Sequence, residues 1–406
     1  MSISIAILSF LFADTTPSGP WSQWGGPGRD FHAPPAKLAE SWPAGGPKQL
    51  WSRQLGDGFS AVVTDGKTLY TMYRGDGNQN ITAAIDPANG KTLWERPLDA
   101  TPLANMFLDY GKGPNSTPLI AGSRLFVATF TGQFAALDRN SGKMLWSKEL
   151  WKELGGTFRD VGYSNSPIAV GDLVIAPVGG QGKGVIALRQ SDGGVAWQKT
   201  NVANAMSSPI LIQVDGKDQL VVFMVDGVAG LDPKTGDQLW LHPHKTDYDV
   251  NAATPVWCPE HKTLVIYSAY SSGARAIQLT PQGPKELWFN RRLRVHHGNL
   301  LRIGDHVYAS SGDFGPAPLT AVHIPTGKIA WQERKFSKAN LIYCDGKVIV
   351  LDEDGNLALA SLSPTGLKVI SEAQPLTKLA WTPPTLAGTK LFIRDRKTLA
   401  AYELGR

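Results

Sequence analysis

The sequence repeats one short unit, and this repeat strongly limits the folds that the chain can adopt. The unit reads AAIDPANGKTLW at 83–94, AALDRNSGKMLW at 135–146 and AGLDPKTGDQLW at 229–240. In each copy a small residue is followed by Asp two positions later, by Gly four further on, and by Trp after four more. A unit with one fixed spacing indicates that the fold contains the same structural element several times.

The further copies are less regular but keep the period. They end at Trp197, Trp331 and, in a worn form with Pro284 in place of the Gly, at Trp288, and a seventh has Ile370 where the Trp would stand. Successive copies are separated by 39 to 52 residues. This period is typical of one four-stranded blade of a β-propeller.

Local chemistry explains each part of the unit. The small residue and the Asp end one strand, the Asn/Ser/Thr-Gly stretch supplies the positive-φ position of a hairpin turn, and the next strand carries the Trp. The Asp can hydrogen-bond the turn amides or a neighbouring indole. A blade cannot bury its own faces, so we predict that the large flat rings wedge between blades. These structural tryptophans are Trp51, Trp94, Trp146, Trp197, Trp240, Trp288 and Trp331.

The chain ends predict the number of blades. The stretch 389–406 supplies inner strands without a Trp strand, and GPKQLWSRQL at 46–55 is a Trp strand without a preceding hairpin. Pairing the two closes the ring and removes exposed sheet edges. We therefore predict an all-β, eight-bladed propeller over residues 45–406. Residues 14–44 form an irregular strap, which we expect on the outside of the ring.

Composition agrees with a turn-rich β protein and excludes some functions. The 406 residues include 43 Gly, 28 Pro and 13 Trp, and only 18% are charged. The net charge of +5 is spread along the chain apart from RRLR at 291–294 and RDRK at 394–397, so we predict no nucleic-acid surface. Cys258 and Cys344 are too few for a disulfide framework or a zinc site of paired cysteines. The two cysteines either form one disulfide or remain as two buried thiols.

The first residues predict export. Residues 1–13 contain an apolar core, followed by a polar segment that starts at Asp14. The core is too short to span a bilayer but suits a signal peptide. We therefore expect a periplasmic or secreted protein with no membrane span.

The repeat, the eight blades and the closure by both termini resemble the pyrroloquinoline-quinone (PQQ)-like propeller superfamily, over residues 45–406. Two classes of protein share this fold. The quinoprotein dehydrogenases oxidise alcohols or sugars with PQQ and Ca²⁺, whereas BamB-type propellers are non-catalytic scaffolds. The chain lacks the adjacent cysteine pair that the resemblance implies for quinoprotein alcohol dehydrogenases, and it has no C-x-x-C-H haem motif. Fold alone does not choose between the two classes.

Polar stretches ahead of several blades are the candidate ligand-binding residues, because they should meet at the channel mouth. FNRRLRVHHGN at 289–299 is the most unusual of them. Adjacent residues of a strand point to opposite faces, so His296 and His297 should not hold one ion together. The candidates are Asn115, Asp160, Tyr163, Asp249, Arg291, Arg294, His296, His297, Asn299 and Trp381. The sequence shows no catalytic residues and no metal-ligand spacing.

We predict a non-catalytic exported scaffold that acts as a monomer and binds an envelope protein or a small molecule. The alternative is a small oxidoreductase whose PQQ and Ca²⁺ would be held by Arg291, Arg294, Asp160, Asp249 and Trp381. A glycan-binding or glycan-cleaving propeller would need two neighbouring carboxylates among Asp109, Asp160 and Asp249.

Overall fold

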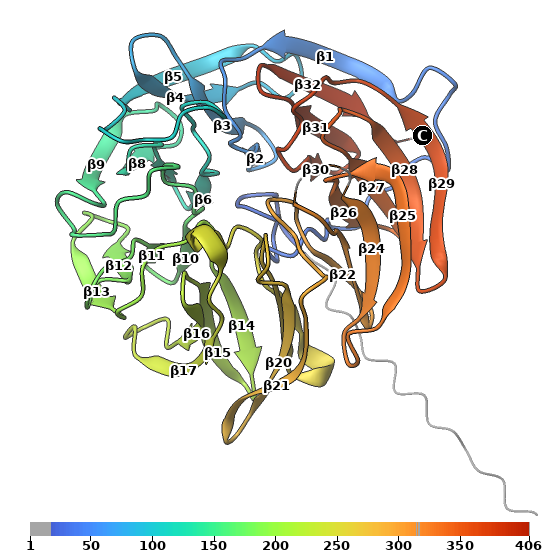
Figure 1. The fold of residues 1–406 in the computed structure, drawn as a ribbon. Coiled ribbons are helices and arrows are strands. Elements are labelled where there is room, and N and C mark those ends of the chain that lie inside the picture. Colours follow the sequence, from blue (N-terminus) through green and yellow to red (C-terminus); the bar gives the residue numbers. More distant parts are fainter. Residues whose placement is uncertain (1–17, 314, 316, 406) are drawn as a thin grey trace, which may run out of the picture.

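The protein is a ring of eight antiparallel four-stranded sheets around a central channel (Figure 1). The computed structural model describes residues 18–313, 315 and 317–405, so the predicted signal peptide at 1–13 lies outside the described residues. The eight-bladed all-β prediction is confirmed. The only helices in the described ranges are the 3-10 turns η1 (Asp247–Asp249) and η2 (Pro259–His261).

Each blade runs from an inner strand beside the channel to an outer strand at the outer circumference of the ring. Blades 1 and 2 comprise β2 (Val63–Thr64), β3 (Leu69–Arg74), β4 (Gln79–Ile85), β5 (Thr92–Asp99) and β6 (Leu119–Ala121), β7 (Arg124–Ala128), β8 (Gln133–Asp138), β9 (Met144–Glu149). Blades 3 and 4 comprise β10 (Ile168–Val170), β11 (Leu173–Pro177), β12 (Val185–Arg189), β13 (Val195–Lys199) and β14 (Ile210–Val214), β15 (Lys217–Phe223), β16 (Gly227–Leu231), β17 (Gln238–Pro243).

The second half of the ring has the same plan. Blades 5 and 6 comprise β18 (Val256–Cys258), β19 (Thr263–Tyr267), β20 (Ala274–Thr280), β21 (Gly283–Asn290) and β22 (Leu301–Ile303), β23 (His306–Ser310), β24 (Pro318–His323), β25 (Ile329–Ser337). Blades 7 and 8 comprise β26 (Asn340–Cys344), β27 (Lys347–Leu351), β28 (Leu357–Ser363), β29 (Gly366–Ala373) and β30 (Thr385–Ala387), β31 (Lys390–Arg394), β32 (Thr398–Glu403), β1 (Lys48–Gln54).

The two chain ends close the ring within blade 8. The N-terminal strand β1 pairs antiparallel with β32, with Trp51 opposite Ala401 and Lys48 opposite Glu403. The outer edge of β32 is therefore covered by the N-terminal strand of the same chain, as the orphan Trp strand predicted. This arrangement leaves no blade with an incomplete sheet.

The small residue of the repeat unit lies directly opposite the Trp on the neighbouring strand. A β-bulge accompanies this pairing in the outer hairpin of blades 1 to 6, so the residue just before each Trp is left out of register. A small partner leaves room for the indole to lie across the strand. The pairs are Trp94 with Ala84, Trp146 with Ala136, Trp197 with Ala187, Trp240 with Gly230, Trp288 with Ala276, and Trp331 with Ala321.

The indoles connect neighbouring blades through the turns of the repeat. The Nε1 of Trp94 donates to the carbonyl of Arg139 at 3.1 Å in the turn of blade 2. A Cβ on Gly142 of that turn would lie 2.5 Å from the same ring, and Gly142 has φ 68°. The repeat glycine is therefore required both by the turn and by close contact with the ring. The same contact links Trp51 with Gly90, Trp146 with Gly193, Trp197 with Gly236, and Trp288 with Gly327.

The interface between blades 4 and 5 differs because the repeat unit of blade 5 is degenerate and has Pro284 in place of the glycine. Trp240 donates to Gln219 of its own blade at 2.6 Å, instead of to the next turn. Polar groups bridge this interface. His244 lies 2.7 Å from the Ser268 hydroxyl and accepts a hydrogen bond from Arg275 at 3.0 Å. Arg275 also pairs with Glu286 on β21.

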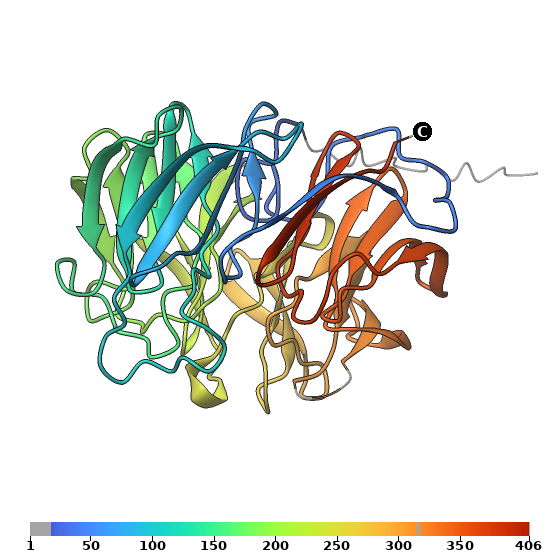
Figure 2. The ribbon, with the colours of Figure 1, turned by 90° about the horizontal axis from the view of Figure 1, so that it is seen from above.

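Residues 20–34 enter the channel, so the prediction of an outer strap is wrong for this part, whereas the following residues run along blades 7 and 8, where the Ala39 amide donates to Leu404 and the Trp42 amide to Ser371. Trp21, Arg29 and Phe31 are 2–4% exposed. Arg29 donates to the carbonyls of Ser166, Pro167 and Pro209 at 2.8–3.1 Å, which belong to blades 3 and 4. Inner strands carry unpaired backbone groups toward the channel, and this plug (20–34) satisfies some of them. Figure 2 shows the plug on the side opposite the long loops.

Two further points concern the whole chain. Cys258 and Cys344 are free and buried, so they do not form a disulfide. Among the described residues, no helix is long and apolar enough to cross a bilayer.

Candidate functional site

The loops that connect successive blades gather at one end of the channel, opposite the plug (Figure 2). They lead from the outer strand of one blade to the inner strand of the next, and the loops between the second and third strands open at the same end. We call this end the channel mouth. Loops carry function more often than the scaffold that positions them.

A continuous row of aromatic and histidine rings crosses the channel mouth. The seven rings come from five loops, and neighbouring centroids are 4.3–5.8 Å apart, a spacing typical of favourable ring contacts. The row runs from Tyr248 to Tyr270 (5.0 Å), His296 (5.3 Å), His297 (5.1 Å), Trp381 (4.3 Å), Tyr110 (5.8 Å) and Phe107 (5.8 Å).

Trp381 lies at the centre of this row and is held from several sides. Its indole Nε1 donates to Glu353 at 3.0 Å, and its ring stacks on Phe59 at 5.4 Å with an interplanar angle of 28°. The Lys338 ammonium lies 5.8 Å from the ring centroid and 3.4 Å from Glu353. The side chain is therefore fixed by hydrogen bonding, stacking and a cation–π contact.

Four ion pairs surround the row and compensate the charges of eight side chains at the mouth. Each pair joins two different loops, which fixes the loops relative to one another. The pairs are Arg159 with Asp249 (3.5 Å), Arg294 with Asp313 (2.9 Å), Lys338 with Glu353 (3.4 Å), and Arg396 with Asp57.

The two histidines of the row are neutral at physiological pH. Burial keeps the pKa of His297 well below its ordinary value, and burial also lowers the pKa of His296. The Nε2 of His297 is buried and has no hydrogen-bond partner among the described residues. These two rings therefore contribute neutral rather than cationic surface to the mouth.

The rings at the two ends of the row are exposed to solvent. Tyr248 is 79% exposed, Tyr110 55% and Phe107 44%, and the nearby Leu103 is 47% exposed. We call the three aromatic residues Tyr248, Tyr110 and Phe107, together with Leu103, the aromatic rim. Large exposed aromatic side chains grouped at one end of a molecule are typical of a surface that binds a partner.

Three predicted ligand-binding residues are used inside the fold. Tyr163 is completely buried, and its hydroxyl donates to the Pro177 carbonyl at 3.1 Å, so it does not reach the mouth. Asn299 is 2% exposed and joins blade 6 to blade 7, because its side-chain amide donates to the Leu341 carbonyl and accepts from the Leu341 amide. Asn115 is half-buried and donates to Ser164 at 3.2 Å. Polar residues ahead of the inner strands thus join neighbouring blades.

Three of the five side chains proposed for PQQ and Ca²⁺, those of Arg294, Asp249 and Trp381, already have partners. Arg294 pairs with Asp313, Asp249 pairs with Arg159, and Phe59 already stacks on Trp381. The Asp160 carboxylate accepts the amide of Val161, and Arg291 is exposed on its loop. A tricarboxylate quinone needs several uncompensated cations and an open ring face. The five proposed side chains therefore do not fit this cofactor as they are arranged.

The glycan alternative also finds no support in these contacts. It needs two carboxylates that face one another, yet the Asp249 carboxylate faces Arg159 and the Asp160 carboxylate caps its own turn. Asp109 is exposed on the preceding loop. The loops that carry the three residues touch, because the Phe107 amide donates to the Asp160 carbonyl at 2.8 Å and Arg159 pairs with Asp249, but no hydrogen bond among the described residues joins two of the three carboxylates.

Sequence reasoning missed several residues of the mouth. Tyr110 lies in the stretch LDYGKGPNS at 108–116, between the polar residues Asp109 and Asn115. Phe59 follows the orphan Trp strand, and Lys338 and Glu353 flank the inner hairpin of blade 7. Their common signal is position, because each lies in a loop that opens at the mouth end.

Fold, repeat and similarity now agree on the class of protein, a PQQ-like β-propeller. A family profile described as outer membrane protein assembly factor BamB matches residues 77–333, more than half of the chain. The chain therefore belongs to this family.

Individual relatives show the same relationship. A protein named outer membrane protein assembly factor BamB from Shewanella oneidensis is 25% identical over 286 residues, which are 66% of this chain and 68% of the relative. The quinoprotein alcohol dehydrogenase PedH of Pseudomonas putida is 25% identical over 173 residues, 41% of this chain and 26% of the relative.

Solved structures share the fold at low sequence identity. BamB from Moraxella catarrhalis superimposes with a TM-score of 0.63 at 19% identity, covering 88% of this chain and 97% of that one. The quinohemoprotein alcohol dehydrogenase ADHIIG of Pseudomonas putida HK5 gives a TM-score of 0.56 at 12% identity, covering 96% and 81%.

Proposed function

We propose that the protein is a non-catalytic, periplasmic scaffold that binds a protein partner during outer-membrane protein assembly. The family described as outer membrane protein assembly factor BamB supports the process, since its profile matches residues 77–333 and a relative that carries this name matches 66% of the chain. The partner is an envelope protein, and the propeller acts as a monomer, in line with a ring whose sheet edges are covered by strands of the same chain.

The observation that carries the proposal is the aromatic rim. Tyr110 and Tyr248 project into solvent from loops that ion pairs and ring contacts hold in place. Tyrosine gives a large binding contact for little loss of side-chain entropy, and fixed loops lower the cost of binding further. The charges behind the rim are paired internally, so they do not require a charged ligand.

The process and the contact surface need separate tests. Deletion of the gene in the native organism should lower the amounts of outer-membrane β-barrel proteins, and the parent chain should restore them. Normal amounts after deletion would contradict the role in assembly. The double variant Tyr110→Ser and Tyr248→Ser should fold normally, because both side chains are exposed. It should restore smaller amounts of these β-barrel proteins than the parent chain does.

Site-specific photo-crosslinking tests the surface directly. A photoreactive phenylalanine at Tyr110 or Tyr248 should capture a defined envelope protein in living cells. The matched control is the same group at Leu239, which is 49% exposed on the outer strand of blade 4. Equal capture at Leu239, or capture there alone, would show that the rim is not the contact surface.

A further inference from the structure

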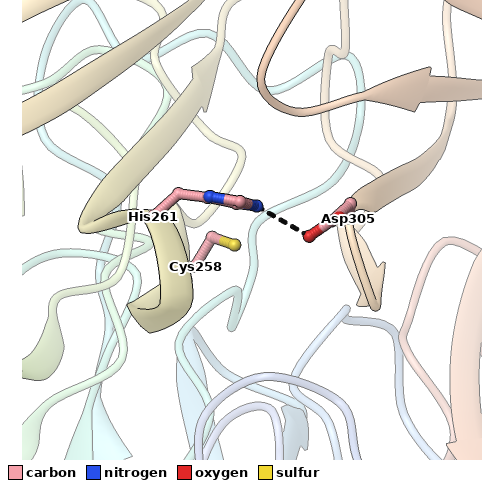
Figure 3. Close-up of side chains that lie close together, drawn as sticks. All are labelled: Cys258, His261 and Asp305. Atoms are coloured by element: carbon pink, nitrogen blue, oxygen red, sulfur yellow. Dashed lines mark hydrogen bonds and ion pairs between the residues drawn. The ribbon is translucent and has the colours of Figure 1, made fainter. Parts of the chain in front are cut away.

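Two inner hairpins at the plug end bring together three side chains that can bind a metal. Cys258 ends β18 and His261 closes η2, so both lie in the first hairpin of blade 5. Asp305 lies in the first hairpin of blade 6, between β22 and β23. Figure 3 shows the three side chains directed toward one point between the blades.

The separation of these groups suits a small divalent ion. His261 Nε2 and Asp305 Oδ1 are 2.8 Å apart, and the ligand atoms of all three residues lie within 4.8 Å of one another. Ligands of tetrahedral zinc, at bond lengths of about 2.0–2.3 Å, are about 3.3–3.8 Å from one another. Small side-chain rotations, without backbone movement, would close the remaining gap.

The backbone around the site is already fixed. Lys262 adopts a left-handed conformation with φ 47°, and its amide donates to the Pro259 carbonyl at 3.1 Å. The Thr263 hydroxyl donates to the His261 carbonyl at 2.9 Å. Lys262 also pairs with Asp215 of blade 4 at 2.5 Å. A ligand turn held in this way loses little entropy when it binds an ion.

The surroundings leave one side of the site accessible. The Cys258 thiol is buried and lies 3.3 Å from the Glu260 carboxylate, which Arg302 holds at 3.1 Å. His261 is half-buried and Asp305 is exposed, so an ion can enter from solvent. Because Glu260 is engaged by Arg302, the fourth position faces water.

We propose that Cys258, His261 and Asp305 bind one zinc-class divalent cation that joins blade 5 to blade 6, with water as the fourth ligand. A thiolate with an imidazole favours zinc over magnesium or calcium, which prefer oxygen ligands. The thiol proton is released as the metal–sulfur bond forms, and the ion replaces the hydrogen bond between His261 and Asp305. This site is independent of the channel mouth and of the proposed function.

Cobalt absorption tests the site, because a Co²⁺–thiolate bond gives a charge-transfer band in the near ultraviolet. The full-length mature protein, without a histidine tag and stripped with a chelator, should bind one equivalent of Co²⁺ with this band. Zn²⁺ should displace the cobalt and raise the melting temperature. Cys258→Ala should abolish the band, and Asp305→Asn should weaken binding by at least about tenfold. Cys344→Ala, which removes the other buried thiol, is the matched control and should keep both effects.

Two results would overturn the inference. Absence of a thiolate band in the parent protein would show that His261 and Asp305 form an ordinary ion pair beside a buried thiol. A band or a Zn²⁺ stabilisation that persists in Cys258→Ala, or an unchanged cobalt affinity in Asp305→Asn, would place the bound metal elsewhere. Asp305 is exposed, so Asp305→Asn stays informative even if Cys258→Ala fails to fold.

Discussion

At the scale of single residues, the repeat glycine and the tryptophan of the preceding blade depend on each other. Gly142→Ala would place a methyl group 2.5 Å from the Trp94 ring in a backbone with φ 68°. We expect the backbone strain to cost about 1–2 kcal/mol and the overpacking about 1–3 kcal/mol more. Urea unfolding, monitored by tryptophan fluorescence, measures the total loss in the free energy of unfolding.

The control for this prediction is Gly122→Ala. Gly122 has a similar φ of 57°, but a methyl group there would meet no atom within 4 Å. It should therefore show the backbone strain alone. Equal destabilisation of the two variants would mean that the ring contact contributes nothing beyond the turn.

A second residue-scale prediction concerns His244, which is 2% exposed. Burial, with added repulsion from Arg275 and His242, lowers its pKa from 6.5 to about 3. Below pH 6.5 the unfolded chain binds a proton at this residue and the folded chain does not, so acid favours unfolding. The free energy of unfolding should fall by up to about 1.4 kcal/mol per pH unit between about pH 6.5 and pH 3 from this residue.

The variant His244→Gln removes this contribution. Its free energy of unfolding should be lower than that of the parent at pH 7.5, because contacts with Ser268 and Arg275 are lost. The slope of its free energy of unfolding against pH should be smaller than that of the parent, by up to the equivalent of one bound proton. Urea titrations at several pH values between 7.5 and 4.5 provide the measurement, and an unchanged slope would contradict the prediction.

At the scale of elements, the plug replaces backbone partners that the inner strands lack. Arg29→Ala removes the donors to the carbonyls of Ser166, Pro167 and Pro209 and leaves them buried. We expect a loss of about 2–5 kcal/mol. Hydrogen exchange should become faster first in β10 and β14, next to these carbonyls, while the exposed control Lys37→Ala should match the parent. Uniform exchange changes would mean that the plug does not act on these blades in particular.

The elements also show what sequence can and cannot predict. Blade number, strand order and closure followed from the unit around Trp94 and its relatives, because the contacts that maintain them recur at a fixed local spacing. The plug did not follow, since Arg29 contacts residues 137 to 180 positions away and belongs to no repeat. The pair of His261 and Asp305, 44 positions apart, was missed for the same reason.

At the scale of the whole molecule, the same ring architecture occurs in binding propellers and in quinoprotein dehydrogenases, so function depends on what the mouth loops contain. Here the loops use their cations internally. Arg294 and Arg159 each face a carboxylate, and Trp381 already stacks on Phe59. The pairing fixes the loops and presents Tyr110 and Tyr248 to solvent, an arrangement suited to a protein partner rather than to a buried tricarboxylate.

Calorimetric titration of the purified protein with PQQ, with and without Ca²⁺, tests this distinction. Binding a tricarboxylate at the mouth would require breaking at least one ion pair, such as Arg294 with Asp313 at 2.9 Å, and separating Phe59 from Trp381. We therefore expect no Ca²⁺-dependent binding tighter than about 1 mM. Micromolar, Ca²⁺-dependent binding that is lost in Arg294→Ala would show instead that these pairs open for a cofactor, and the scaffold proposal would then give way to an oxidoreductase.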